Sequence, residues 1–295
     1  MGRLRWDDIP PEVHREIEQE VGASIVRADD QAPLGTAEFS AAVHTNDGSW
    51  FVKVVPKDEH VHSPSRANEP RLNRLLPRTA PKLLWRRTNG DWVVTGYEYV
   101  YGWNASLAPG SADIPALIQL LTQLAVPVAP GAEQFPSLGA QWSKLSPWRT
   151  LAHNKPRSLG PWERAHLKDF VDLEQYIFDV LFGGTCITHA DVSESNVLIG
   201  QSGMRIVGWT WATRAPAWAD AAVLAVRMVG AGHSPQQAEG WMGNIPAWEN
   251  ASTEALDAFS VALLGLWTAT SRYPKLVDAA RRYATYRLAA NATHQ

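Results

Sequence analysis

The chain has 295 residues, of which 45% are hydrophobic, and it carries 27 basic against 30 acidic side chains. This length is enough for two lobes or one large domain with a substantial core. The high hydrophobic content together with the near balance of charge gives no sign of a disordered chain or of a general nucleic-acid-binding surface. The single cysteine, Cys186, excludes an internal disulfide, and no Cys/His cluster has zinc-ligand spacing, which together predict a reducing, cytoplasmic environment.

Neither a membrane span nor a secretory signal is expected. No run reaches the roughly 18 uncharged apolar residues that a membrane helix needs. The first residues, 1–8, turn acidic where a signal peptide would need its apolar stretch. We therefore expect no membrane partner.

The first predicted element is an amphipathic helix over residues 11–21. A Pro-Pro pair precedes it and Gly22 follows it, which is the usual start and stop of a helix. Val13, Ile17 and Val21 recur on one face. This face is expected to pack against the strands that follow.

Short β-type runs then alternate with turn signals up to residue 100. The Asn-Asp-Gly turn at 46–48 predicts a hairpin between its neighbours, and Asn89-Gly90 predicts a second turn. A helix is expected near residues 65–76, although Pro70 lies inside it. The predicted strands are 25–26, 39–44, 50–55, 82–85 and 92–100. The first lobe is thus a mainly antiparallel sheet with one packed helix.

Helical patterns dominate the rest of the chain. Ile114–Leu124 forms the first such helix, with Asp113 as its expected N-cap. Residues 126–160 are dense in Pro, Gly and Ser, so we expect an ordered excursion with little regular structure. Further helices are predicted at 161–182, 218–231, 234–243, 252–272 and 274–290, and a small hairpin at 196–209.

The segment Ile187–Ile199 carries the clearest chemical pattern, His-x-Asp followed by four residues and Asn, then aliphatic residues. In phosphoryl transfer an aspartate accepts the proton of the attacking hydroxyl, and an asparagine five residues later holds a metal that bridges the nucleotide phosphates. Asp191 and Asn196 have this spacing. The segment resembles the catalytic loop of kinases; the alternative is a polar surface loop.

Residues 188–222 resemble the aminoglycoside and choline phosphotransferases, small-molecule relatives of protein kinases. The resemblance implies an α+β, two-lobed protein-kinase-like fold, with residues 1–100 as the small antiparallel lobe and 101–295 as the helical lobe. In that family the second hairpin strand ends in Asp-Trp or Asp-Phe, and the aspartate chelates magnesium. Here Gly208-Trp209 stands at that place, and glycine has no side chain that can chelate.

The resemblance also implies two supporting residues in the helical lobe. Asp220 lies in the run that enters a helix, where the family's aspartate braces the catalytic loop; a simple helix N-cap is the alternative. His189 is expected to brace the loop and not to act as a base. Glu194, inside the loop, could partly replace the metal ligand missing at Gly208.

In the first lobe the resemblance implies a nucleotide site. Lys53 in its strand would contact the nucleotide phosphates and Glu69 would pair with it, unless Lys53 is an ordinary edge-strand lysine. Gly35 and Thr36 lie in the turn that would cover the phosphates, and Glu98 and Val100 in the hinge that would hold an adenine edge, unless this stretch is a plain connector. The implied cofactors are ATP or GTP with Mg²⁺, whose site Gly208 would weaken or remove.

Three interpretations remain open. The chain is an active O-phosphotransferase, or a pseudokinase that binds nucleotide or another ligand without turnover, or an active enzyme in which Gly208 is an isolated change. Residues 104–295 hold 14 Lys/Arg against 15 Asp/Glu, so the acidic surface that a polycationic aminoglycoside needs is not supported. A neutral or weakly charged compound with a hydroxyl group is the expected substrate.

Overall fold

The computed structural model describes residues 5–31, 39–58, 69–128, 135–154, 159–270 and 274–292. Contacts divide the chain into two units, Met1–Trp103 with Leu198–Trp211, and Asn104–Val197 with Ala212–Gln295. The predicted lobe boundary after residue 100 stays a prediction. Most of the hairpin that the sequence pattern places in the second lobe groups with the first unit.

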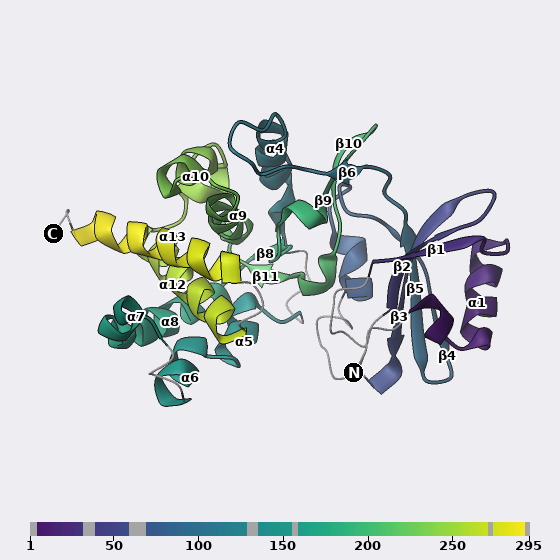
Figure 1. Cartoon of the computed structure of the whole chain (residues 1–295), viewed down its shortest axis with the longest axis horizontal. Helices are drawn as coiled ribbons and strands as arrows, with labels where there is room; N and C mark the ends of the chain where they lie inside the picture. Colours follow the sequence, from purple (N-terminus) through teal and green to yellow (C-terminus); the bar gives the residue numbers. More distant parts are fainter. Residues whose placement is uncertain are drawn as a thin grey trace. The chain divides into compact units, whose positions relative to one another are not determined.

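The first unit is built on a five-stranded antiparallel sheet of order β1-β2-β3-β5-β4 (Figure 1). The predicted hairpin is confirmed, because the strands on either side of its turn pair antiparallel. Thr45 closes the turn, and its hydroxyl oxygen accepts the backbone N–H groups of Asp47 and Gly48 at 3.1 Å each. The strands are β1 (Arg27–Asp30), β2 (Phe39–His44), β3 (Ser49–Pro56), β4 (Leu83–Asn89) and β5 (Trp92–Glu98).

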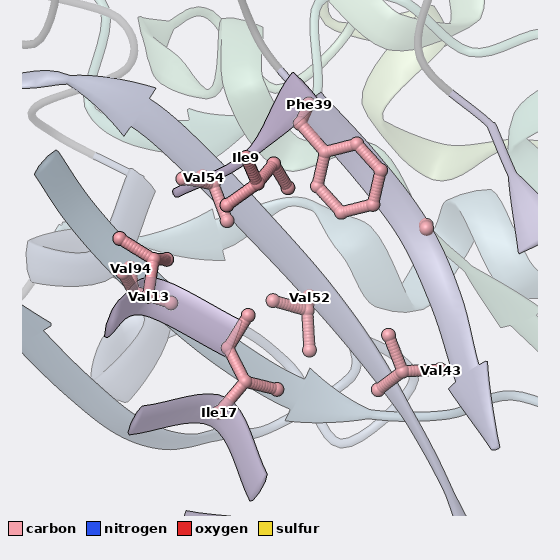
Figure 2. Close-up of a cluster of buried hydrophobic side chains, with 9 residues drawn as sticks. Ile9, Val13, Ile17, Phe39, Val43, Val52, Val54 and Val94 are labelled. Carbon is pink, nitrogen blue, oxygen red and sulfur yellow. The ribbon is translucent and has the colours of Figure 1, made fainter. Parts of the chain in front are cut away.

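Helix α1 (Pro11–Val21) buries its apolar stripe against one face of this sheet. Figure 2 shows Val13 and Ile17 beside the valines of β3 and β5. The helix ends at Gly22, whose φ of 76° lies in the left-handed region that glycine adopts without strain. Because side chains alternate along a strand, burial of Val52 and Val54 in this cluster directs Lys53 to the opposite face.

Residues 69–72 are helical and lead into η2 (Asn73–Leu75). The first unit also includes η1 (Trp6–Asp8), β10 (Gly203–Ile206) and η5 (Trp209–Trp211). Strands β6 (Trp103–Asn104) and β9 (Val197–Gly200) contain the points at which the chain passes from one unit to the other.

The second unit is mainly helical, and α12 (Thr253–Thr270) is buried along most of its length. Helices α6, α8, α9 and α13 contact it. Within the described ranges, no helix is both long and apolar enough to cross a bilayer. The other helices are α4 (Ile114–Leu124), α5 (Leu138–Ser143), α6 (Pro147–Asn154), α7 (Pro161–Ala165), α8 (Leu167–Phe182), α9 (Ala219–Gly230), α10 (Pro235–Met242), α11 (Pro246–Glu249) and α13 (Pro274–Ala292), with η4 (Glu194–Asn196) and the strands β7 (Val126–Pro127), β8 (Cys186–Thr188) and β11 (Thr213–Ala215).

The expectation of little regular structure over residues 126–160 was wrong. Two helices lie there, because residues that usually mark loops serve as helix starts. The Ser137 hydroxyl accepts the N–H of Ala140 and caps α5, and Pro147 occupies the first position of α6. Trp142 and Trp148 are core residues of these helices.

Two further predictions needed correction. The first strand begins at Arg27 and not at Ile25, because it is a polar edge strand without an apolar signal. Asp113 precedes α4 but does not cap it with its side chain; its carboxylate accepts the backbone N–H of Ser106 instead. The short helix α11 had no counterpart among the predicted elements.

Trp148 is fully buried beside Gly265 of α12. Its indole N–H donates to the carbonyl oxygen of Val261 at 2.7 Å, one turn before the glycine. A Cβ atom at Gly265 would lie only 2.5 Å from the indole nitrogen. Gly265 is therefore required by the close approach of the tryptophan ring.

We predict that Gly265→Ala destabilises the protein by about 1–3 kcal/mol through overpacking, although alanine has the higher helix propensity. Gly240→Ala is the matched control, because Gly240 lies exposed in α10 and a Cβ there meets nothing within 4 Å. This control should stabilise by about 0.5–1 kcal/mol. Urea unfolding followed by circular dichroism measures both. Shifts of equal sign would contradict the packing argument.

Candidate active site

Lys53 forms a buried ion pair with Glu69 in the first unit. Its Nζ atom lies 2.9 Å from Oε1 and 2.7 Å from Oε2 of Glu69, and both residues are less than a tenth exposed. Pro70 follows Glu69 without preventing this contact. Since a buried charge needs a partner, the pair fixes the direction of the lysine side chain across the sheet face.

Thr210 completes this group and was not foreseen from the sequence. Its hydroxyl oxygen accepts a hydrogen bond from Lys53 at 2.9 Å and donates to Oε2 of Glu69 at 3.0 Å. The contact joins residues more than 140 positions apart. Its one sequence signal is its place two residues after Gly208, in the short turn η5 that follows the hairpin.

Gly208 lies between β10 and η5 with a φ of 78°. This left-handed conformation is strained for most residues, but aspartate and asparagine adopt it more readily than others. The backbone at this position is therefore compatible with the aspartate that the sequence pattern leads one to expect. The glycine supplies no carboxylate.

Glu98 and Val100, the two residues predicted to lie in the hinge, differ in their contacts. Arg205 donates to both carboxylate oxygens of Glu98, at 3.1 and 2.8 Å, and this hydrogen bonding lowers the pKa of Glu98. The backbone N–H of Glu98 donates to the Lys82 carbonyl, and the side chain is held by Arg205, so Glu98 serves the packing of the first unit. Val100 is half-buried just beyond β5. Gly35 and Thr36, predicted to cover the phosphates, lie outside the described residues.

The loop that begins at His189 is held in place by the side chain of Asp220. The backbone N–H groups of His189 and Ala190 donate to Oδ2 and Oδ1 of this carboxylate, each at 2.8 Å. Asp220 lies in the first turn of α9, where a carboxylate interacts favourably with the helix dipole. Burial nevertheless raises the pKa of Asp220, against the opposing effects of His189 and of the two backbone donors.

Ala190 has a φ of 62°. For a residue with a Cβ atom this left-handed conformation costs about 1–2 kcal/mol. The hydrogen bond from its N–H to Asp220 holds the strained peptide in place, so the sharp bend that presents the next residue, Asp191, depends on Asp220.

Asp191 and Asn196 are brought together by this bend. The amide nitrogen of Asn196 donates to the backbone oxygen of Asp191 at 2.9 Å and to Oδ2 of its carboxylate at 3.3 Å. The backbone N–H of Asp191 donates to Nδ1 of the fully buried His189. These two hydrogen bonds hold the Asn196 side chain against Asp191.

Arg227 contacts Asp191 directly and was also not foreseen. Its Nη2 atom lies 2.5 Å from Oδ1 of Asp191. It projects from α9, two turns beyond Asp220, in a helix whose other residues after Asp220 are uncharged. A lone basic residue in an apolar helix is the signal that could have marked it.

Glu194 has one carboxylate oxygen and its backbone oxygen engaged by the segment before α4, and its role as a substitute metal ligand stays a prediction. Its Oε1 atom accepts the backbone N–H of Leu107 at 2.7 Å, and its carbonyl oxygen accepts the amide of Asn104 at 3.0 Å. Both contacts tie the catalytic loop to the segment before α4.

The donor set does not fit a magnesium site held by two protein side chains. Asn196 offers one amide oxygen, and one oxygen of Asp191 is paired with Arg227. In the portion of the chain that the structure describes, no group of three or more His, Cys, Asp or Glu side chains could hold a metal ion. We therefore derive no step through a protein-bound metal.

The family model of the phosphotransferase enzyme family matches residues 31–252, and the chain belongs to this family. A solved choline kinase from Streptococcus pneumoniae is similar to it, with a TM-score of 0.65, 12% identity, and coverage of 95% of this chain and 99% of that one. No curated protein matches significantly.

Two aminoglycoside phosphotransferases are also similar in structure. The complex of APH(2")-IIIa with GDP and kanamycin has a TM-score of 0.62, 15% identity and coverage of 96% and 100%. A ternary complex of APH(4)-Ia with ADP and hygromycin B has a TM-score of 0.59, 13% identity and coverage of 94% and 98%. The predicted α+β, protein-kinase-like fold, with an antiparallel first part and a helical second part, is confirmed.

We predict that Asp220→Asn weakens the catalytic loop selectively. An amide has only one acceptor oxygen, so one of the two loop N–H groups would face an NH₂ group and lose its partner, which costs about 1–3 kcal/mol. Hydrogen exchange at His189 and Ala190 should become faster.

Asp257→Asn is the matched control for this experiment. Asp257 is likewise a buried aspartate of the second unit, but it binds Nε of Arg287 at 2.7 Å, on other helices. Its substitution should lower global stability without selective exchange at the two loop amides. Equal loop exchange in both variants would argue against the bracing role of Asp220.

Proposed function

We propose that this protein transfers the terminal phosphoryl group of ATP or GTP to a hydroxyl group of a small molecule. The observation that carries the proposal is the loop in which Asn196 orients Asp191 while Asp220 holds the bend before it. Membership of the phosphotransferase family supports the reaction type. The nucleotides in the two similar aminoglycoside phosphotransferase complexes support the choice of phosphoryl donor.

In the proposed reaction Asp191 acts as the proton acceptor. The acceptor oxygen attacks the terminal phosphorus, the bond from phosphorus to the bridging oxygen breaks, and the nucleoside diphosphate leaves with that electron pair. The hydroxyl proton passes to the Asp191 carboxylate. Oδ2 is the oxygen proposed to take the proton, because its contact with the Asn196 amide is long, at 3.3 Å, whereas Oδ1 lies 2.5 Å from Arg227.

Lys53 is proposed to bind the nucleotide phosphates. Its charge is positioned by Glu69 and Thr210, and both partners are themselves held by hydrogen bonds. A preorganised ammonium stabilises phosphate charge without the cost of ordering a flexible chain. Asn196 is proposed as the one protein ligand available to a magnesium ion that arrives with the nucleotide.

The acceptor is proposed to be neutral or weakly charged and not a polycation. The second lobe has nearly balanced charge, with 14 basic and 15 acidic residues over 104–295. We also propose a cytoplasmic location, since the single cysteine, Cys186, is buried and unpaired.

A pseudokinase is the second candidate, and Gly208 is the observation that favours it. Without a carboxylate at this position, the charge of the transferring phosphoryl group has less stabilisation, and each 1.4 kcal/mol lost is about a tenfold loss in rate. Such a protein would bind nucleotide and use the bound state for regulation or scaffolding. The third interpretation, an isolated change at Gly208 in an active enzyme, is separated from these by restoring the carboxylate.

We predict that saturating nucleotide stabilises the protein. At about 100 times the dissociation constant the gain is about 2.7 kcal/mol, read as a rise in melting temperature with ATP or GTP, with and without magnesium. Lys53→Met should lose most of this rise, whereas Lys57→Met, which alters an exposed lysine beyond β3, should keep it.

Lys53→Arg serves as a second variant in case the loss of the buried charge prevents folding, and it should retain part of the rise. The absence of any rise with either nucleotide would argue against both the enzyme and the nucleotide-binding pseudokinase.

We predict that Gly208→Asp raises the rate of phosphoryl transfer or nucleotide hydrolysis at least tenfold in the presence of magnesium. The left-handed backbone at this position accepts aspartate with modest strain. Adding Asp191→Asn to this variant should abolish the gain, because the proton acceptor is lost. A coupled assay for nucleoside diphosphate release measures both. If neither form turns over while nucleotide still binds, the pseudokinase is the correct function.

A further inference from the structure

Arg227 is an unusual residue for its surroundings. Helix α9 is apolar, and apart from Asp220 in its first turn Arg227 is its only charged residue. Its guanidinium lies over the ring of Trp267, 5.6 Å from the ring centroid. An aromatic face of this kind stabilises a cation without neutralising it.

Most of the hydrogen-bonding capacity of Arg227 is not used within the described parts of the chain. A guanidinium carries five N–H donors. One nitrogen, Nη2, contacts Asp191, and the buried Nε atom has no hydrogen-bond partner there. Since a buried donor without a partner is costly, the arrangement favours a further hydrogen-bond acceptor that the described residues do not supply.

The position of Arg227 indicates which molecule supplies that hydrogen-bond acceptor. A substrate hydroxyl that donates to Asp191 lies about 2.7 Å from a carboxylate oxygen, and Oδ1 of the same carboxylate is 2.5 Å from the guanidinium. The acceptor molecule therefore stands within a few ångströms of the arginine. About 19% of the arginine side chain is exposed.

We propose that Arg227 is a specificity-determining residue that selects an acceptor alcohol bearing an anionic group, a carboxylate or a phosphate. This proposal rests on the proposed function. A planar guanidinium forms paired hydrogen bonds with either anion. An ammonium group in the same place is repelled, so amino sugars are poor acceptors.

The test uses four probes with one six-carbon polyol skeleton: D-gluconate, D-glucitol 6-phosphate, D-glucitol and D-glucamine. Their terminal groups are a carboxylate, a phosphate, a hydroxyl and an ammonium. Binding to the full chain in the presence of ADP is measured by saturation-transfer NMR. We expect at least one anionic probe to bind about tenfold or more tightly than D-glucitol, and D-glucamine to bind most weakly. The two anionic probes distinguish a carboxylate from a phosphate group.

Substitutions at Arg227 connect this preference to the residue. Arg227→Gln should remove the tenfold advantage, and Arg227→Lys should keep part of it because the charge remains. Arg282→Gln is the matched control, since Arg282 belongs to the same unit but binds Asp278 and the carbonyl of Val229. It should leave the order of the probes unchanged.

Equal binding of the four probes, no binding of any of them, or an advantage that survives in Arg227→Gln would overturn the proposal. If Arg227→Gln does not fold, the order of the probes in the unsubstituted chain and in Arg227→Lys decides. The nucleotide-dependent rise in melting temperature, measured on the same samples, tests the proposed function separately. A rise without anion preference refutes only the role of Arg227, and anion preference without a rise refutes only the phosphotransfer.

Discussion

The loop that carries Asp191 depends on one buried carboxylate. Asp220 accepts the N–H groups of two successive residues, and one of these, Ala190, has a left-handed backbone that alanine does not adopt without strain. The free energy for this conformation comes from the hydrogen bonds to Asp220, whose own burial is unfavourable and raises its pKa. The bend presents Asp191, which Asn196 and Arg227 then hold. A polar interaction in the interior of the second unit thus sets the position of the groups proposed to do the chemistry.

Elements whose signals are local could be predicted from the sequence. Helix α1 was bounded by its prolines and Gly22, and the β2–β3 hairpin by its Asn-Asp-Gly turn, because these residues act on the backbone next to them. Helices α5 and α6 were missed because their local signals are ambiguous. Ser137 and Pro147 mark a loop and a helix start equally well, and only burial of the tryptophans in the core of the second unit decides between the two.

The residues of the candidate site likewise fall into those with a local sequence signal and those without one. Asp191 and Asn196 could be nominated because their spacing within one loop reflects the chemistry they perform. Thr210 and Arg227 could not, because their contacts join distant parts of the chain, and neither residue has a fixed spacing from its partner. Glu69 was an intermediate case. Pro70 lies next to Glu69 in the predicted helix, yet the Glu69 carboxylate stays within reach of Lys53.

Arg227 alters the charge balance around Asp191. Its guanidinium places a positive group beside the carboxylate, 2.5 Å from Oδ1. A divalent cation gains less from such a set, since the charge of Asp191 is already shared with a guanidinium. A cationic acceptor likewise gains less beside this pair than beside a free carboxylate. The Nε atom of Arg227, which is buried and has no hydrogen-bond partner among the described residues, is the feature on which the proposed preference for an acid rests.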